Sequence, residues 1–485
     1  MAGERLLYRN PGAFATVTVL QGEGSYKELR VNDVPEVPTD YGCLQAFHAL
    51  GHLPCLTHGS PERALVLCFG AGITTGAISI HGLERIDAVE VCPDVVEANL
   101  YFFEENRHVL ADDRVRLILE EGRSYLSRSG DSYDLIACDS THPRSGDSWM
   151  LYTREFYELC LRRLRPGGVL CQWLPIHGLK PSEYKRVVRT FLSVFPDTTL
   201  WFLNRFTLLL GGGRSSLIDF GRFARGLKGS GVREDLRPYH LEDACAFLSW
   251  FVAGGDDLPR YADGAEIITD RAPLPRGSTP ERLATDTKPL NLAELCAIRR
   301  EVASILRGAP AAARNKLKKY HEAREHSLQG RIFCFQGRYE RERECYLEAL
   351  KALPGDRDTR VLLREAEWNL LLAEGKKSVE EGALEKACKL YRKGLRADGH
   401  AGAALYNLGV VHLKMGRYDR AVRYFRGALQ TVPWNAEAHY HLAAAYWNKG
   451  KEADCRAELE RALELEPRME KARRALARLG REDAR

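Results

Sequence analysis

The sequence predicts a doubly wound α/β domain of the Rossmann-like type, followed by an all-α repeat array. Three observations carry this prediction. Short apolar segments alternate with helical segments between residues 64 and 175, which is typical of parallel strands buried on both faces. Small residues and prolines recur at a fixed interval near the carboxyl terminus. A chain of 485 residues is also too long for one ordinary core, so two or three domains are expected.

The composition is that of an ordinary globular chain. Hydrophobic residues make up 45% and charged residues 28%, and the net charge is only +5. This small surplus of positive charge does not predict binding to nucleic acid. The first residues lack the apolar stretch of a signal peptide, and no segment reaches the ~18 apolar residues that span a bilayer. We therefore expect a cytoplasmic protein without a membrane span.

The 13 cysteines include no C-x-x-C pair. Several of them, including Cys68, Cys138 and Cys171, lie inside apolar segments. This placement indicates buried free thiols in a reducing compartment rather than disulfides or zinc ligands. The sequence therefore predicts no metal site.

The amino-terminal segment, residues 1–58, is predicted to form a hairpin and a helix. Residues 15–33 alternate in strand fashion on both sides of the turn sequence GEGS. An amphipathic helix is predicted for residues 43–56. The hairpin and the helix precede the first predicted strand of the parallel sheet.

Residues 59–215 are predicted to form the nucleoside-binding α/β domain. Its five parallel strands are expected at ALVLCFG, RIDAVEV, VRLILE, YDLIACD and GGVLCQWL. Helices are predicted over 73–83, 93–106 and 151–165. Two further apolar segments, TTLWFL and FTLLLG, are separated by two residues and predict a closing antiparallel pair. Residues 216–318 mix polar loops with short helical stretches and are predicted to be a lobe and linker.

Residues 319–485 carry the repeat. The recurring pairs, each 34 residues apart, are Gly416 and Gly450, Leu408 and Leu442, Phe425 and Leu459, and Pro433 and Pro467. Small residues let two helices approach closely, and proline breaks the chain before the next helix. Gly337 and Gly382 mark earlier units that are 45 residues apart, which predicts an inserted helical turn pair. This pattern resembles tetratricopeptide repeats, which implies a surface for a protein partner or for self-association. We expect the repeats, with a C-terminal capping helix, to stack on one another rather than on the sheet.

Glycine and acidic residues at the predicted strand ends mark a candidate nucleoside site. Gly70 and Gly72 follow the first strand, where glycines let the backbone approach a ligand and the next helix presents free N–H groups. Glu90 ends the second strand about 20 residues later, where a carboxylate can accept hydrogen bonds from ribose hydroxyls. The third strand ends at Glu121 and Gly122. Polar groups at successive strand ends favour a small nucleoside over a dinucleotide such as NAD. The alternatives are a turn built for packing and a carboxylate that caps a helix.

Several segments between residues 10 and 213 carry a family resemblance: ALVLCFGAGITTG, DAVEVCPDVVEA, ENRHVLADDRVRLILEEGRSYL, YDLIACDSTHP and LYTREFYELCLRRLRPGGVLCQWL. They resemble the polyamine aminopropyltransferase (spermidine synthase) family, in particular bacterial spermidine-synthase-like proteins that are often fused to a transporter domain. The resemblance implies a class I methyltransferase-type sheet with a small N-terminal β domain. It also implies that Gly70, Gly72, Glu90, Glu121 and Gly122 line a pocket for decarboxylated S-adenosylmethionine as co-substrate, with no tightly bound cofactor.

The fourth strand leads into the loop Asp139-Ser140-Thr141-His142-Pro143, where the family has D-S-S/T-D-P. Aminopropyl transfer is a displacement by an amine nitrogen on the carbon next to a sulfonium, so carboxylates can anchor one amine and accept a proton from the other. The resemblance therefore implies catalytic roles for Asp139 and His142. A histidine accepts a proton near neutral pH, but it does not hold an ammonium group as a carboxylate does. The alternatives are a capping role for Asp139 and a surface-loop position for His142.

Three functions are compatible with these features. The first is an aminopropyltransferase-like transferase that acts on a small-molecule amine, with the repeats used for protein docking. The second is an S-adenosylmethionine-dependent methyltransferase on the same sheet, because a fold does not fix a function. That enzyme needs a donor for the methionine carboxylate, and the glycine loop offers only Thr74 and Thr75. The third is a non-catalytic, nucleoside-binding scaffold for the repeats.

Overall fold

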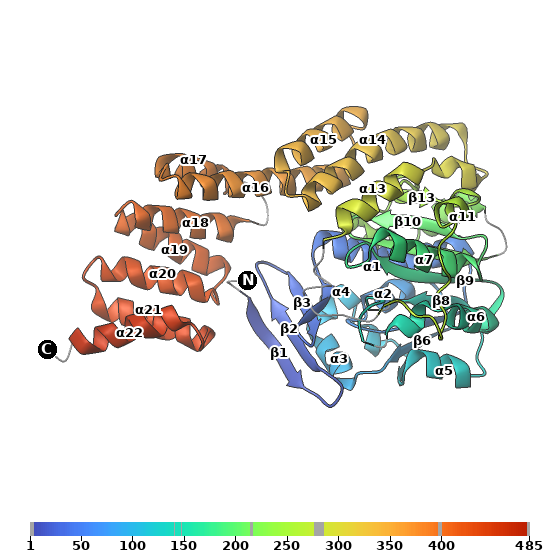
Figure 1. Ribbon diagram of the computed structural model, residues 1–485, viewed down its shortest axis with the longest axis horizontal. Helices are drawn as coiled ribbons and strands as arrows, with labels where there is room; N and C mark the ends of the chain where they lie inside the picture. Colours follow the sequence, from blue (N-terminus) through green and yellow to red (C-terminus); the bar gives the residue numbers. More distant parts are fainter. Residues whose placement is uncertain are drawn as a thin grey trace. The chain divides into compact units, whose positions relative to one another are not determined.

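The computed structural model describes residues 4–139, 141–146, 148–213, 217–275, 286–395 and 400–482 (Figure 1). Ser140 of the predicted catalytic loop lies outside the described residues. The chain divides into two compact units. The α/β unit comprises Asn10–Thr18 and Leu29–Arg360, and the repeat unit comprises Met1–Arg9, Val19–Glu28 and Val361–Arg485.

An eight-stranded sheet forms the centre of the α/β unit, with the strand order β13-β10-β11-β9-β8-β5-β6-β7 (Figure 1). The parallel strands are β5 (Arg63–Leu67), β6 (Arg85–Glu90), β7 (Val115–Leu119), β8 (Tyr133–Cys138) and β9 (Leu164–Pro175). Every residue of β8 is buried, as expected for a strand covered on both faces. The antiparallel strands are β10 (Thr199–Leu203), β11 (Phe206–Gly212) and β13 (Phe251–Ala253). The predicted Rossmann-like sheet and its closing antiparallel pair are confirmed.

Helices pack against the sheet in two groups. The first group contains α1 (Tyr41–His58), α2 (Ile73–Ser79), α3 (Pro93–Ala98) and α4 (Phe103–Asn106). The second contains α5 (Gly122–Arg128), α6 (Arg154–Arg163) and α7 (Pro181–Leu192), of which α6 packs on β9 and α7 on β11. The predicted helical segments are present. The helices α2 and α6 are shorter than predicted, the segment 93–106 is divided into α3, a short 3-10 helix and α4, and α1 is longer than predicted.

The helix α1 differs from the amphipathic helix that the sequence predicted. It is buried almost throughout, from Gly42 to Leu56 with Leu44 as the exception. One side packs on β8, β9 and β11. The other side is covered by α8 (Phe220–Gly226) and α9 (Ser230–Leu236), which belong to the region predicted as a lobe and linker. The prediction was incomplete, because the sequence pattern gave no indication of this second covering layer.

The amino-terminal strands form a small sheet of their own. The order is β1 (Arg5–Pro11), β2 (Thr16–Gln21), β3 (Lys27–Val31) and β4 (Val34–Pro38). The predicted hairpin corresponds to β2 and β3, and β1 and β4 extend it on either side. The small N-terminal β domain is therefore confirmed, with four strands instead of two.

Short helices complete the α/β unit before the repeats begin. They are α10 (Ala244–Leu248), α11 (Asp257–Tyr261) and α13 (Lys288–Ile298). The strands β12 (Ile218–Asp219) and β14 (Leu306–Arg307) form a separate parallel pair. None of the helices that the structure describes is long and apolar enough to cross a bilayer.

The carboxyl-terminal helices form the predicted repeat array. They are α14 (Ala311–Phe335), α15 (Tyr339–Ala352), α16 (Arg357–Glu380), α17 (Leu384–Gly394), α18 (Ala401–Lys414), α19 (Tyr418–Thr431), α20 (Ala436–Trp447), α21 (Glu452–Leu465) and α22 (Glu470–Glu482). The turns inside the helix pairs use Gly337, Gly382, Gly416 and Gly450, all with φ between 68° and 73°. This left-handed conformation explains why glycine recurs there.

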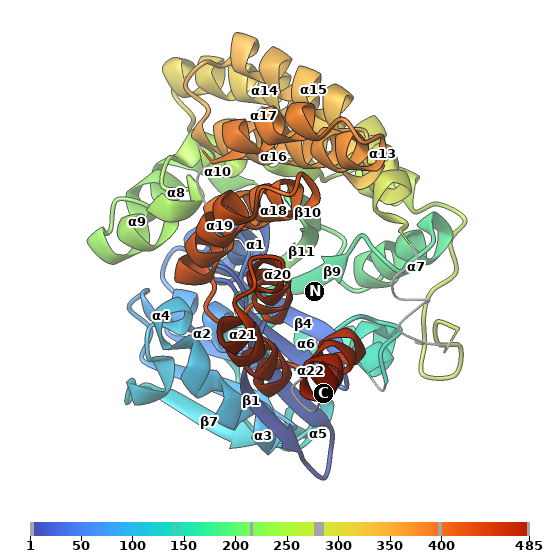
Figure 2. The ribbon, with the colours of Figure 1, turned by 90° about the vertical axis from the view of Figure 1, so that its left-hand side faces the viewer.

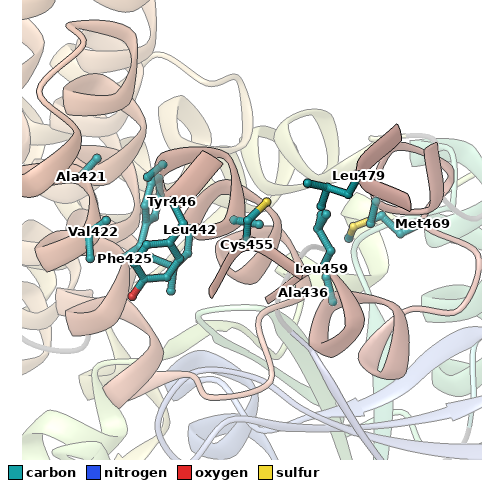
Figure 3. Packing of buried hydrophobic residues seen from close by; sticks show 14 residues of the cluster. Ala421, Val422, Phe425, Ala436, Leu442, Tyr446, Cys455, Leu459, Met469 and Leu479 are labelled. Carbon is teal, nitrogen blue, oxygen red and sulfur yellow. The ribbon is translucent and has the colours of Figure 1, made fainter. Parts of the chain in front are cut away.

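Close helix contacts explain the other recurring positions. A Cβ atom on Gly330 would lie 2.6 Å from the ring of Tyr346, and one on Gly409 would lie 2.6 Å from the ring of Phe425. The four last helices, from α19 to α22, share one buried cluster, which includes Phe425, Leu442 and Leu459 (Figure 3). Successive helices from α18 to α22 lie side by side (Figures 1 and 2).

The insertion between the early repeats lengthens a helix. The helix α16 has 24 residues, whereas α18 has 14. The extra ten residues correspond to roughly three turns of one continuous helix. The sequence predicted about one added pair of helical turns, and the structure has about three, all within α16.

A buried carboxylate fixes the first repeat helices to the α/β unit. Asp358, at the start of α16, receives a hydrogen bond from Arg324 of α14 at 2.7 Å, and both side chains are almost completely buried. Its other oxygen accepts hydrogen bonds from Tyr41 (2.7 Å), Gln45 (2.9 Å) and Asn204 (3.3 Å). The first repeat helices therefore pack on the α/β domain, contrary to the expectation that the array stacks only on itself. The compact units divide at residue 360, whereas the predicted domain boundary lies at residue 318.

Replacement of Asp358 by alanine is expected to destabilise the α/β unit by about 3–5 kcal/mol. The substitution removes the carboxylate that accepts a hydrogen bond from the buried Arg324 guanidinium and leaves only Asp356, at 3.6 Å, to balance its charge, which is the costly way to break a buried ion pair. Urea denaturation followed by circular dichroism measures the change. Glu344→Ala is the control, because Glu344 pairs with Arg341 on the exposed surface of α15 and is expected to change stability by no more than about 0.5 kcal/mol. Equal stability of the two variants would contradict the role of Asp358.

Candidate functional site

A cavity of about 470 Å³ lies at the carboxyl ends of the parallel strands. Its walls come from the loops that follow β5, β6, β7 and β8, together with residues of β3 and β4. The strands β5 and β8 are neighbours at the centre of the sheet, where the strand order reverses. Doubly wound sheets bind ligands at this crevice, and the volume suits a ligand of nucleoside size.

The structure brings most of the predicted site residues to this cavity. Those on its wall are Gly70, Glu90, Glu121, Gly122 and Asp139. Gly72 and His142 are not part of the wall. The fold therefore brings the predicted site residues together at one cavity, except Gly72 and His142, and each exception has its own physical reason.

Glu90 connects the loops after the first two parallel strands. Its carboxylate accepts hydrogen bonds from the backbone N–H groups of Gly70 at 3.1 Å, Val91 at 2.9 Å and Cys92 at 3.0 Å. Burial raises the pKa of Glu90, and these three hydrogen bonds act in the opposite direction. A carboxylate offers about four lone-pair sites, so Glu90 keeps capacity for a ligand hydroxyl.

The two glycines of the first loop have different roles. Gly70 and Gly72 both have positive φ, at 56° and 77°. Gly70 lies on the cavity wall and its N–H is bonded to Glu90. A Cβ atom on Gly72 would lie 2.7 Å from Nδ2 of Asn99 and 2.8 Å from the ring of Phe69. Gly72 is thus required for close packing behind the loop, and it does not line the cavity.

Glu121 lines the cavity and caps α5 at the same time. One carboxylate oxygen accepts from the N–H of Arg123 at 2.8 Å, and the other accepts from the N–H and the hydroxyl of Ser124, each at 2.7 Å. Capping by a side-chain oxygen satisfies N–H groups that a helix start leaves unbonded. The capping alternative therefore describes Glu121, and its predicted ligand contact remains a prediction.

Asp139 follows β8, and the protonation of its carboxyl group changes near neutral pH. Burial raises its pKa to about 7, while a hydrogen bond from the Thr74 hydroxyl, at 2.7 Å, acts to lower it. A group with a pKa near the working pH is well suited to accept a proton during a reaction. The position and the chemistry of Asp139 agree with the predicted catalytic role.

His142 holds the loop after β8 in place. Its Nε2–H donates to the carbonyl of His177 at 2.9 Å, and its Nδ1 accepts from the backbone N–H of Arg144 at 3.1 Å. The ring is buried, and burial lowers its pKa to about 4. Because both ring nitrogens are bonded to backbone groups, the geometry gives His142 a structural position outside the cavity.

The sequence gave no indication of Glu36, which lies on β4 and faces the cavity. Burial, reinforced by the nearby charge of Glu90, raises the pKa of Glu36 to about 8. Its position depends on how the small sheet covers the strand ends, which no local pattern reveals. Trp173 of β9 also lies on the wall.

The cavity is strongly acidic. Its carboxylic acids are Glu36, Glu90, Glu120, Glu121 and Asp139. Among the described residues of the wall there is no lysine, arginine or histidine. Apolar side chains such as Phe47 and Trp173 form much of the remaining surface. A cleft lined by one sign of charge concentrates ligands of the opposite sign, so this cavity favours a cation with an apolar part.

A larger hollow of about 750 Å³ lies at the amino end of β9. It contains none of the predicted site residues. Arginine side chains from α8 and β14 contribute to its wall, together with His81. The predicted site residues at the strand ends line the acidic cavity and not this hollow.

Comparison with known proteins places this fold and site in a family. A family model described as "Spermine/spermidine synthase domain" matches residues 46–203. The polyamine aminopropyltransferase of Serratia proteamaculans is 33% identical over 200 residues, which cover 41% of this chain and 69% of that protein. The chain belongs to the polyamine aminopropyltransferase (spermidine synthase) family. Tetratricopeptide repeat models match residues 372–433 and 412–479.

Other relatives are similar over a smaller part of their length. The polyamine aminopropyltransferase of Nitrosomonas europaea is 38% identical over 148 residues, which cover 30% of this chain and 44% of that protein. Putrescine N-methyltransferase 2 of Nicotiana attenuata is 29% identical over 184 residues, which cover 36% of this chain and 49% of that protein. The chain thus spans about half the length of these relatives.

A solved spermidine synthase in complex with the transition-state analogue AdoDATO is also similar to the chain. It is 21% identical, with a TM-score of 0.40, over 44% of this chain and 75% of that one. A probable spermidine synthase of Corynebacterium glutamicum is 16% identical, with a TM-score of 0.40, over 56% of this chain and 97% of that one.

Replacement of Glu36 by glutamine is expected to make stability less dependent on pH above 7. An acid whose pKa is raised in the folded state binds its proton more tightly than in the unfolded chain, so folding stability falls as pH rises toward about 8. The variant lacks this acid, and its stability should therefore fall less steeply. Urea denaturation between pH 7 and 8.5 avoids the range in which the buried histidines titrate. Glu344→Gln, an exposed acid, is the control, and an unchanged slope in Glu36→Gln would contradict the assignment.

Proposed function

We propose that the protein transfers an aminopropyl group from decarboxylated S-adenosylmethionine to a small amine. The observation that carries this proposal is the acidic cavity at the switch point of the sheet. The co-substrate carries a sulfonium and a primary ammonium group, and a polyamine acceptor carries further ammonium groups. Buried carboxylates without a neighbouring cation are well matched to such ligands.

The proposed reaction is a single displacement in which Asp139 takes part. The lone pair of a neutral amine attacks the carbon next to the sulfonium, the C–N bond forms and the C–S bond breaks. The electron pair of the broken bond remains on sulfur, which leaves as the neutral thioether methylthioadenosine. The amine then loses a proton to the Asp139 carboxylate. The hydroxyl of Thr74 holds that carboxylate at 2.7 Å and fixes its orientation.

Glu90 is proposed to hold the nucleoside. Its carboxylate is fixed by three backbone N–H groups, so it can accept a hydrogen bond from a ribose hydroxyl without reorganisation. The apolar wall formed by Phe47, Leu151 and Trp173 would contact the aliphatic and aromatic parts of the ligands. Gly70 and Gly122 leave room at the strand ends for the nucleoside to approach the backbone.

Methyl transfer from S-adenosylmethionine is the second candidate, because relatives of the chain include putrescine N-methyltransferases. Intact S-adenosylmethionine carries a carboxylate, and the described wall of the cavity offers it five acids and no basic side chain. This electrostatic mismatch favours the decarboxylated co-substrate. An assay with each co-substrate and a panel of amines separates the two functions. Methylthioadenosine is the product of the first reaction and S-adenosylhomocysteine is the product of the second.

The repeat unit is proposed to bind a protein partner or a second copy of the chain. The support is the match of residues 372–479 to tetratricopeptide repeat models, whose stacked helices offer extended surfaces. A reducing compartment such as the cytoplasm is also proposed. The 13 cysteines are all free thiols, and most of them are buried.

Replacement of Asp139 by asparagine is expected to lower kcat by about 10²–10⁴-fold, because the amide keeps the shape but accepts no proton. In the wild type, kcat should rise with pH through about 7 as the carboxylate forms, and this rise should be absent in the variant. Release of methylthioadenosine between pH 5.5 and 9 gives both results. Asp113→Asn, an exposed change at the turn before β7, is the control. Wild-type turnover by Asp139→Asn would remove Asp139 from the mechanism.

Replacement of Glu90 by alanine is expected to weaken methylthioadenosine binding by about 10- to 150-fold. This range corresponds to the roughly 1.5–3 kcal/mol of a hydrogen bond to a charged group. Calorimetric titration measures the affinity, and circular dichroism shows whether the loop at Gly70 still permits folding. Glu104→Ala, an exposed change on α4, should bind like the wild type. Unchanged affinity in a folded Glu90→Ala variant would exclude Glu90 from the nucleoside site.

A further inference from the structure

Two histidines and an aspartate converge inside the α/β unit, away from the acidic cavity. His48 and His52 lie one turn apart on α1, and both rings face Asp235 of α9. Nδ1 of His48 is 2.6 Å from Oδ2 of Asp235, and Nε2 of His52 is 2.8 Å from the same oxygen. The three residues are 3%, 0% and 7% exposed, so this is a buried cluster and not a chance surface group. None of them lines the acidic cavity.

We propose that His48, His52 and Asp235 bind a divalent metal ion of the zinc type. Two imidazole nitrogens and one carboxylate oxygen are a ligand set that zinc uses with a fourth, non-protein position. The spacing of four residues on one helix directs both rings to the same side, as a shared ligand requires. All three ligand atoms lie within 4.8 Å of one another.

The distances between the three ligand atoms fit a tetrahedral metal site after a small adjustment. Zinc–nitrogen and zinc–oxygen bonds of about 2.0–2.2 Å place neighbouring ligand atoms of a tetrahedral site roughly 3.3 Å apart. The observed contacts to Asp235, at 2.6 and 2.8 Å, need to open by roughly 0.5–0.7 Å.

The surroundings hold the ligands as a metal site requires. Nδ1 of His52 is 2.8 Å from Nε2 of His81, so His52 can donate its Nδ1–H to His81 and present the Nε2 lone pair to the metal. The ring of His48 stacks on Tyr239 with centroids 4.5 Å apart, which fixes its orientation.

Charge and access are also compatible with a bound cation. Arg107 donates to the second oxygen of Asp235 at 3.2 Å, and its side chain is 45% exposed. Its guanidinium can therefore turn to solvent when a metal takes over the charge of Asp235. His81 lines the larger hollow at the amino end of β9, which gives the cluster a route to solvent. A bound metal would fasten α1 to α9, the helix that covers its outer side.

A network of hydrogen bonds without metal is the competing arrangement. In it, His48 and His52 donate their N–H groups to Asp235, and His81 donates to His52. The two arrangements differ in the tautomer of His52 and in their response to metal. A titration therefore decides between them.

The test uses the full chain, freed of metal with a chelator and titrated with Co²⁺ alone. We expect one equivalent of Co²⁺ to produce the visible absorption of a tetrahedral nitrogen and oxygen site, Zn²⁺ to abolish this absorption, and Zn²⁺ to raise Tm. His81→Gln, which changes only the partner of His52, should weaken metal binding about 10- to 100-fold. Asp235→Asn should abolish the absorption.

Two controls keep the result specific to this cluster. His326→Gln removes an exposed histidine of α14 and should bind Co²⁺ like the wild type. If Asp235→Asn does not fold, His48→Gln and His52→Gln replace it as ligand deletions. A wild type that shows neither Co²⁺ absorption nor a Zn²⁺-dependent Tm overturns the proposal. Equal Co²⁺ binding by the folded ligand variants overturns it as well, because the metal would then lie elsewhere.

Discussion

The organisation of the α/β unit depends on how it accommodates several acids around one cavity. Buried charges are costly unless they are paired or hydrogen-bonded, and each acid here meets this constraint in its own way. Glu90 is held by three backbone N–H groups, and Glu121 caps α5. Glu120 pairs with Arg128 at the rim. Asp139 accepts one hydrogen bond, from the Thr74 hydroxyl, and burial raises its pKa to about 7, while burial raises that of Glu36 to about 8. The cavity can thus release these protons when a positively charged ligand binds.

The sequence was sufficient for the elements whose signals are local. Apolar strands and glycine turns depend on residues that are close in the chain, so the strands of the sheet and the repeats could be derived from them. Glu90 and Asp139 could be located because the ends of parallel strands meet at one edge of the sheet. Glu36 could not, since it reaches the cavity only through the packing of the small sheet. The roles of Gly72 and His142 were also out of reach, because they depend on contacts with Asn99 and with the backbone of residue 177.

The same dependence on contacts between residues far apart in the chain explains why the sequence described α1 incompletely. Its pattern predicted one apolar and one polar face, and both faces exist in the structure. The polar face carries Gln45, His48 and His52, which are three and four residues apart and therefore lie on one side of the helix. Solvent would normally cover such a face. Here Asp358 of the first repeat helices and Asp235 of α9 cover it and supply its hydrogen-bond partners.

This arrangement connects the added helices to the chemistry of the cavity through one element. Phe47 of α1 forms part of the cavity wall, and its carbonyl lies 3.4 Å from the Thr74 hydroxyl that bonds Asp139. The next residue on the helix, His48, belongs to the buried cluster on the other side. A rigid helix transmits the position of one face to the other, because its backbone hydrogen bonds resist deformation. The lobe and the first repeat helices therefore help to set the position of the cavity wall beside Asp139.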